Sequence, residues 1–76
     1  MSKSKKAFTN YEINKNIAKT LVLHRVWTGY TQTALAVDLN VTFQQIQKYE
    51  NCLNRISAEN LIFLCKKRKW DIQLFL

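Results

Sequence analysis

Hydrophobic residues recur three and four positions apart along most of this chain, and this spacing is typical of one face of an α-helix. A second pattern repeats five times between Phe8 and Leu76. Each repeat begins with an apolar residue, which is followed directly by a side chain that can cap a helix. A second apolar residue then stands at the fourth position of the helix. This is the hydrophobic staple around a helix start, and each cap stabilises its helix by about 1 kcal/mol. The capping residues are Thr9, Thr31, Thr42, Ser57 and Asp71. The pattern predicts five helices and an all-α fold.

The predicted helices cover residues 10–28, 32–39, 43–50, 58–67 and 72–76. Gly29 and Asn40 follow the first two helices, and both residue types tolerate the left-handed backbone conformation that ends a helix. One face of the first helix is predicted to hold Ile13, Ile17, Leu21 and Arg25. On the fourth helix, the residues predicted to be buried are Leu61, Ile62, Leu64 and Cys65.

The second and third helices, within residues 31–50, are short and are joined by a tight turn at Asn40. Apolar residues mark the inner side of both helices. They are Leu35, Ala36, Leu39, Ile46 and Tyr49. Two helices of this size joined in this way form a helix-turn-helix unit, whose second helix lies in the major groove of DNA.

The outer side of the third helix carries Gln44, Gln47 and Lys48 and no acidic residue. Glutamine can form two hydrogen bonds with an adenine edge, and lysine can contact guanine or a phosphate. The alternative is a solvent-facing helix surface that happens to be rich in glutamine. This helix alone does not decide between the two interpretations.

Length and charge limit the size of the domain and the kind of partner it binds. The 76 residues have room for one small domain, and a formal charge of +7 with a pI near 9.7 favours an anionic partner, either nucleic acid or a membrane surface. No apolar run approaches a membrane span and the N-terminus lacks a signal-peptide core, so we expect a cytoplasmic protein with no membrane partner. Residues 1–8 are predicted to be a disordered basic arm, and residues 9–76 a helix-turn-helix DNA-binding domain.

Residue types that carry catalysis or bind metals do not cluster in the sequence. His24 has no Cys or Asp at ligand spacing, and no Ser/His/Asp or Cys/His constellation is visible. We therefore expect no enzyme, no metal, no cofactor and no small-molecule ligand. Cys52 and Cys65 are predicted to be reduced thiols, because two distant cysteines form neither a disulfide scaffold nor a zinc site.

The spacing Arg25-x6-Gln32-x2-Leu35-Ala36, followed by Val41-Thr42-x3-Ile46-x2-Tyr49-Glu50-Asn51, resembles the Cro and phage-repressor (lambda-repressor-like) helix-turn-helix family. The resemblance covers about residues 16–76. It implies a compact five-helix domain that binds operator DNA, usually as a dimer.

The resemblance also implies roles for individual residues. The positions that match base-reading residues are Thr42, Phe43, Gln44, Gln47 and Lys48, of which Gln47 lies on the flank. The positions that match contacts with the DNA backbone are Gln32, Thr33, Asn51 and Arg55. For Gln32 the physics agrees, since free N–H groups at a helix N-terminus attract phosphate. Gln45 is left out of the base-reading set because the capping box gives it a structural role. Phe43 either touches a thymine methyl group or folds back on the domain.

Arg25 and Glu50 match a family ion pair that is largely buried and does not contact DNA. A buried arginine on an apolar stripe needs a carboxylate partner, which agrees with this role. Cys52 departs from the family, which usually has glycine there, and a positive φ would strain it by about 1 kcal/mol. Trp27 replaces a polar residue of the family. It packs against Tyr30 or the N-terminal arm, or it belongs to a partner surface.

These observations favour a sequence-specific DNA-binding transcriptional regulator, and in particular a repressor, that reads a palindromic operator as a homodimer. The C-terminal apolar residues are expected to divide between the core and the dimer contact. They are Ile72, Leu74, Phe75 and Leu76. One alternative is an antitoxin-like or other protein-interaction module on the same fold, with DNA binding secondary. Another is non-specific binding to nucleic acid through charge alone.

Overall fold

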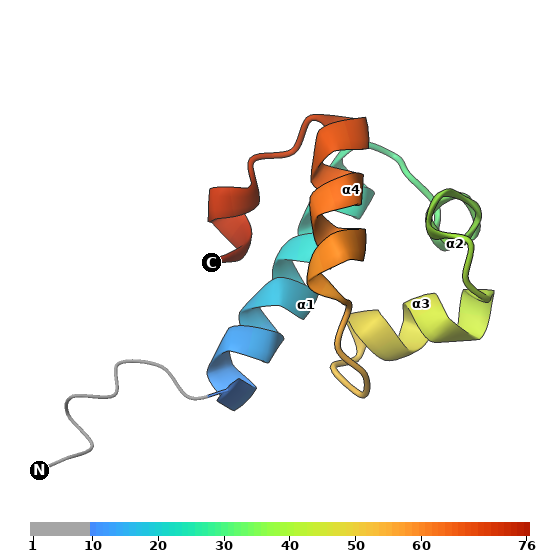
Figure 1. Ribbon diagram of the computed structural model, residues 1–76. Coiled ribbons are helices and arrows are strands. Elements are labelled where there is room, and N and C mark those ends of the chain that lie inside the picture. Colours follow the sequence, from blue (N-terminus) through green and yellow to red (C-terminus); the bar gives the residue numbers. More distant parts are fainter. Residues whose placement is uncertain (1–9) are drawn as a thin grey trace, which may run out of the picture.

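The computed structural model describes residues 10–76, so the predicted basic arm of residues 1–8 lies outside the described residues. Within this part the chain forms four α-helices and one short 3-10 helix, with no strand (Figure 1). The elements are α1 (Asn10–Trp27), α2 (Gln32–Leu39), α3 (Phe43–Glu50), α4 (Ala58–Arg68) and η2 (Ile72–Phe75). The predicted all-α class is confirmed, and α2 and α3 have the predicted bounds.

The predicted count of five α-helices is wrong at the C-terminus. The expected helix over residues 72–76 is the four-residue 3-10 helix η2. Its backbone hydrogen bonds join residues three apart, from Leu74 N–H to Asp71 C=O at 3.0 Å and from Leu76 N–H to Gln73 C=O at 3.2 Å. A segment this short cannot extend the ladder that offsets α-helix nucleation, so the tighter turn forms.

Three of the predicted N-caps are present with the same geometry. The hydroxyl oxygens of Thr31, Thr42 and Ser57 each accept a hydrogen bond at 3.0 Å from the backbone N–H three residues later. Gly29 and Asn40 adopt the left-handed conformation, with φ of 70° and 56°. These caps and turns fix where α2, α3 and α4 begin and where α1 and α2 end.

Each element contributes one large side chain to the centre of the single core. These fully buried residues are Leu21, Leu35, Ile46, Leu64 and Phe75. Burying a side chain of this size stabilises the fold by about 1.5–3 kcal/mol. The core therefore holds α3 against α1 and α2, and η2 against α1 and α4 (Figure 1).

Two predicted core residues lie at the surface instead. Ile13 is exposed because it sits near the N-terminal end of α1, which projects beyond the other elements in Figure 1. Ile62 is exposed because α4 turns Leu61, Leu64 and Cys65 toward the core, and Ile62 lies about 100° around the helix from Leu61. No helix among residues 10–76 is long and apolar enough to cross a bilayer.

Candidate nucleic-acid interface

The turn between α2 and α3 sets the direction in which α3 leaves the core. The N–H of Asn40 donates to the carbonyl of Val37 at 3.2 Å, and the N–H of Val41 donates to that of Ala36 at 3.0 Å. These two bonds close the end of α2 and need the left-handed backbone at Asn40. Thr42 then caps α3 through the N–H of Gln45. The chain therefore changes direction within a few residues and starts a second helix at a large angle to the first (Figure 1).

The two sides of α3 differ sharply in chemistry. Ile46 and Tyr49 are buried in the core. The exposed residues at and after the helix start are Thr42, Phe43, Gln44, Gln47 and Lys48. This set has no carboxylate, and Gln45 between them is half-buried. All five base-reading candidates are thus exposed to solvent, at or along a helix about 12 Å long.

Phe43 is 41% exposed, and it is not among the buried residues of the core cluster. It therefore lies at the surface and is not folded fully back into the core. An exposed phenyl ring therefore stands at the start of α3, beside side chains that form hydrogen bonds.

The end of α3 is attached to α1 by an ion pair between Arg25 and Glu50, the two residues that the sequence analysis expected to meet. The Nε of Arg25 donates to Oε2 of Glu50 at 2.6 Å, and its Nη2 donates to Oε1 at 3.0 Å. The Nη1 of Arg25 also donates to the carbonyl of Tyr30 at 3.2 Å. Because the Glu50 side chain is only 6% exposed, this pair is shielded from solvent.

Gln32 also belongs to this network, a role that the sequence did not predict. Its Nε2 donates to Oε1 of Glu50 at 2.8 Å, so the side chain points into the domain and is half-buried. One of the two N–H groups of this amide is therefore taken by Glu50 and is not available for the expected phosphate contact. The backbone N–H groups of Gln32 and Thr33 have no partner within the helix and lie in the first turn of α2. They are free to bind a phosphate at this position.

The remaining backbone-contact candidates follow α2 and α3 at the surface. Thr33, Asn51 and Arg55 are all exposed. Cys52 has φ of 64°, so this position does adopt the positive φ that favours glycine. Asn14 donates from Nδ2 to the sulfur of Cys52 at 3.3 Å, which ties the loop after α3 to α1.

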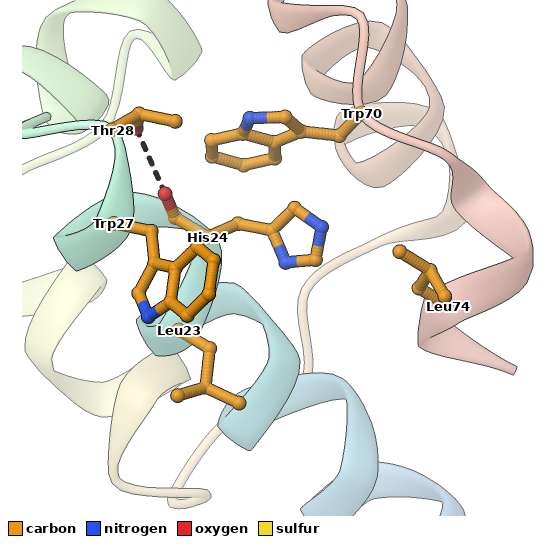
Figure 2. Close-up of a pocket in the computed structure, with 6 residues that line it drawn as sticks. All are labelled: Leu23, His24, Trp27, Thr28, Trp70 and Leu74. Carbon is orange, nitrogen blue, oxygen red and sulfur yellow. Dashed lines mark hydrogen bonds between the residues drawn. The ribbon is translucent and has the colours of Figure 1, made fainter.

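A second surface feature lies where α1 meets η2. An apolar groove of about 370 Å³ opens there, lined by Leu23, His24, Trp27, Thr28, Trp70 and Leu74. Figure 2 shows the His24 ring next to that of Trp70, with Trp27 and Leu23 on one side of it and Leu74 on the other. Trp27 is 87% exposed, so it does not pack against Tyr30. Figure 1 places η2 and α3 at opposite sides of the domain.

The fold and the two-sided α3 agree with a comparison against known families. A family model described as helix-turn-helix matches residues 24–67, which include all of α2 and α3 and most of α4. The chain belongs to the helix-turn-helix family of the Cro and phage-repressor type. The match also includes Arg25, Gln32 and Glu50, and so covers the whole network behind α3.

Curated proteins similar to this helix-turn-helix chain come from several bacteria. A protein of Sinorhizobium fredii named as an HTH-type transcriptional regulator is 33% identical over 63 residues, which cover 83% of this chain and 44% of that protein. One of Rickettsia conorii with the same kind of name is 34% identical over 84% of this chain and 51% of its own length. A transcriptional regulator in the ATPase CF(0) region of Rhodospirillum rubrum is 34% identical over 88% of this chain and 62% of its own. This chain thus spans about half the length of these relatives. No solved structure matches it.

Proposed function

We propose that this chain is a sequence-specific DNA-binding transcriptional regulator, with α3 as the helix that enters the major groove. One observation carries the proposal. The exposed side of α3 has three side chains suited to base edges and phosphates, namely Gln44, Gln47 and Lys48, while the only carboxylate of α3, that of Glu50, is turned inward and paired. A helix surface without negative charge can approach DNA closely without electrostatic cost.

The contacts divide into two kinds in this proposal. The free N–H groups at the start of α2, together with Asn51 and Arg55 after α3, hold phosphates and fix the position of the domain on the duplex. Gln44 reads an adenine edge, and Lys48 contacts guanine or an adjoining phosphate. The formal charge of +7 adds long-range attraction to DNA and makes the binding sensitive to salt.

We further propose that the chain acts as a homodimer and represses transcription by occupying its operator. Leu74 and Leu76 are exposed apolar residues at the C-terminus, and Leu74 borders the groove beside Trp27. A second copy of the chain covers this face in our proposal, so that two α3 helices read half-sites about one helical turn apart. Sedimentation analysis tests it. Leu74→Glu is expected to lower self-association, whereas the equally polar change Leu53→Glu, at an exposed loop residue, leaves it unchanged.

Selection of bound fragments from random DNA tests sequence-specific binding. We expect a palindromic consensus. On that operator, Gln44→Ala is expected to lower the preference over random DNA by about 1–3 kcal/mol, or about 5- to 150-fold. The matched control is Gln73→Ala, because Gln73 is an exposed glutamine on η2. An equal loss on operator and random DNA in Gln44→Ala would contradict base reading by Gln44.

The protein-interaction module remains a second candidate because of Trp27. An indole that is 87% exposed beside an apolar groove is typical of a protein-binding surface. In this candidate a different protein covers the groove and DNA binding is secondary. It predicts that the isolated chain stays monomeric at all concentrations and that selection from random DNA yields no consensus.

A further inference from the structure

Phe43 differs from every other side chain on the proposed DNA-facing side of α3. It is the first residue of the helix, and the N-terminal residues of a recognition helix come closest to base edges. Its exposed neighbours Thr42, Gln44, Gln47 and Lys48 are polar or cationic. Phe43 alone in this set can neither donate nor accept an ordinary hydrogen bond. Its ring therefore favours an apolar partner.

The local structure fixes the backbone from which this ring projects. The cap from Thr42 to the N–H of Gln45 fixes the first turn of α3, and the fully buried Ile46 anchors that turn in the core. Phe43 itself makes no contribution to the core cluster. Because 41% of this residue is open to solvent at the start of α3, part of its apolar surface is available to meet the DNA.

The major groove offers one apolar group to such a ring. All four base pairs present hydrogen-bond donors or acceptors there, and only thymine adds a methyl group, at C5. A phenyl ring placed against any other edge would leave a polar group without a partner, which lowers affinity. We infer that Phe43 recognises the C5-methyl group of one thymine in each half-site of the operator. This inference rests on the proposed function, because it requires α3 to lie in the major groove.

Removing single methyl groups from the DNA tests the inference. In the operator obtained by selection, each thymine is replaced in turn by deoxyuridine, which removes the methyl group and keeps the base pair. Affinity is measured by fluorescence anisotropy at one fixed salt concentration. At one thymine per half-site, the unmodified protein is expected to lose about fourfold per half-site, the factor that burial of one methyl-sized group represents. Replacing that thymine by 5-methylcytosine is expected to retain more affinity than replacing it by cytosine.

Two protein variants connect this effect to Phe43. Phe43→Ala is expected to bind thymine and deoxyuridine operators equally at that position, with the folded state checked by circular dichroism. Phe63→Ala is the matched control, because Phe63 is 48% exposed and lies on α4, outside the helix-turn-helix unit. It is expected to keep the full difference between the two operators.

The outcomes separate this inference from the function on which it rests. If selection yields no consensus, the proposed base reading fails and the inference fails with it. If a consensus appears but no deoxyuridine substitution weakens binding, the inference is overturned and the proposed function stands. The same holds if Phe43→Ala keeps the methyl effect, since packing of the ring on the sugar-phosphate backbone would then explain its exposure.

Discussion

Replacing Arg25 by methionine removes the central donor of the network behind α3. In the structure Glu50 accepts two hydrogen bonds from Arg25 and one from Gln32, while its side chain is only 6% exposed. Methionine preserves most of the apolar stem of arginine and removes the charge. Glu50 is then left as a shielded carboxylate with a single neutral donor.

The expected cost follows from this environment. Removing one partner of a buried ion pair destabilises a protein by about 3–5 kcal/mol, because the other charge is left uncompensated. The Arg25 side chain is 16% exposed, so water can reach the pair, and Gln32 keeps its bond. We therefore expect the lower limit, about 3 kcal/mol, for Arg25→Met. For a domain of this size that corresponds to a fall in Tm of about 12–24 °C.

Thermal and urea unfolding, followed by tryptophan fluorescence and circular dichroism, measure this effect. Lys67→Met is the control. The ion pair of Lys67 with Asp38 is long, at 4.0 Å, and the Lys67 side chain is 46% exposed, so its loss is expected to cost less than about 0.5 kcal/mol. Arg25→Met/Glu50→Leu is expected to regain most of the lost stability, since no unpaired carboxylate remains. An unchanged Tm in Arg25→Met, or a double variant no more stable than the single one, would refute the argument.

Further predictions concern stability, pH and salt. Cys52→Gly is expected to raise the free energy of unfolding by at most about 1 kcal/mol in urea titrations, because glycine adopts the φ of 64° without strain, while the lost bond from Asn14 to the Cys52 sulfur offsets part of the gain. Burial, with a smaller effect from the nearby Asp71 carboxylate, raises the pKa of the Cys65 thiol above its usual 9.0. The folded state therefore disfavours the thiolate. The contribution of the protonated Cys65 thiol to stability is complete below pH 9 and is lost as pH rises above 9. Cys65→Ala is expected to show a smaller decline in the free energy of unfolding between pH 8 and pH 10. Operator affinity is expected to fall about 1,000-fold or more between 50 and 200 mM salt if six or more phosphates are contacted, and a flat salt response in a titration would rule out backbone anchoring.

Local interactions made much of this fold predictable from the sequence. The caps at Thr31, Thr42 and Ser57 bond to the backbone three residues later, so a short sequence window contains both partners. The left-handed turns at Gly29 and Asn40 likewise depend on residue type at one position. The bounds of α2 and α3 follow from these features, and they place the proposed DNA-facing side of α3.

Features that depend on distant parts of the chain were not predictable in the same way. The bond from Gln32 to Glu50 joins residues 18 positions apart, and nothing in the local pattern of α2 marks Gln32 as an inward-pointing donor. Lys69 adopts φ of 59° although it is not a residue type favoured there. It ends α4 so that Trp70 can reach the His24 and Phe75 rings, with centroids 5.1 and 6.4 Å from that of Trp70.

The network around Glu50 also connects stability to recognition. Its carboxylate receives hydrogen bonds from α1 through Arg25 and from α2 through Gln32, and it stands at the last residue of α3. An apolar contact at the same place would permit small rotations of α3, whereas three directed hydrogen bonds favour one orientation. A base-reading helix must be held to within about 0.5 Å of its productive position. We therefore expect Arg25→Met/Glu50→Leu to regain stability and still lose at least about tenfold in its preference for operator over random DNA, a loss of about 1.4 kcal/mol. Full discrimination in that stable double variant would show that the core alone orients α3.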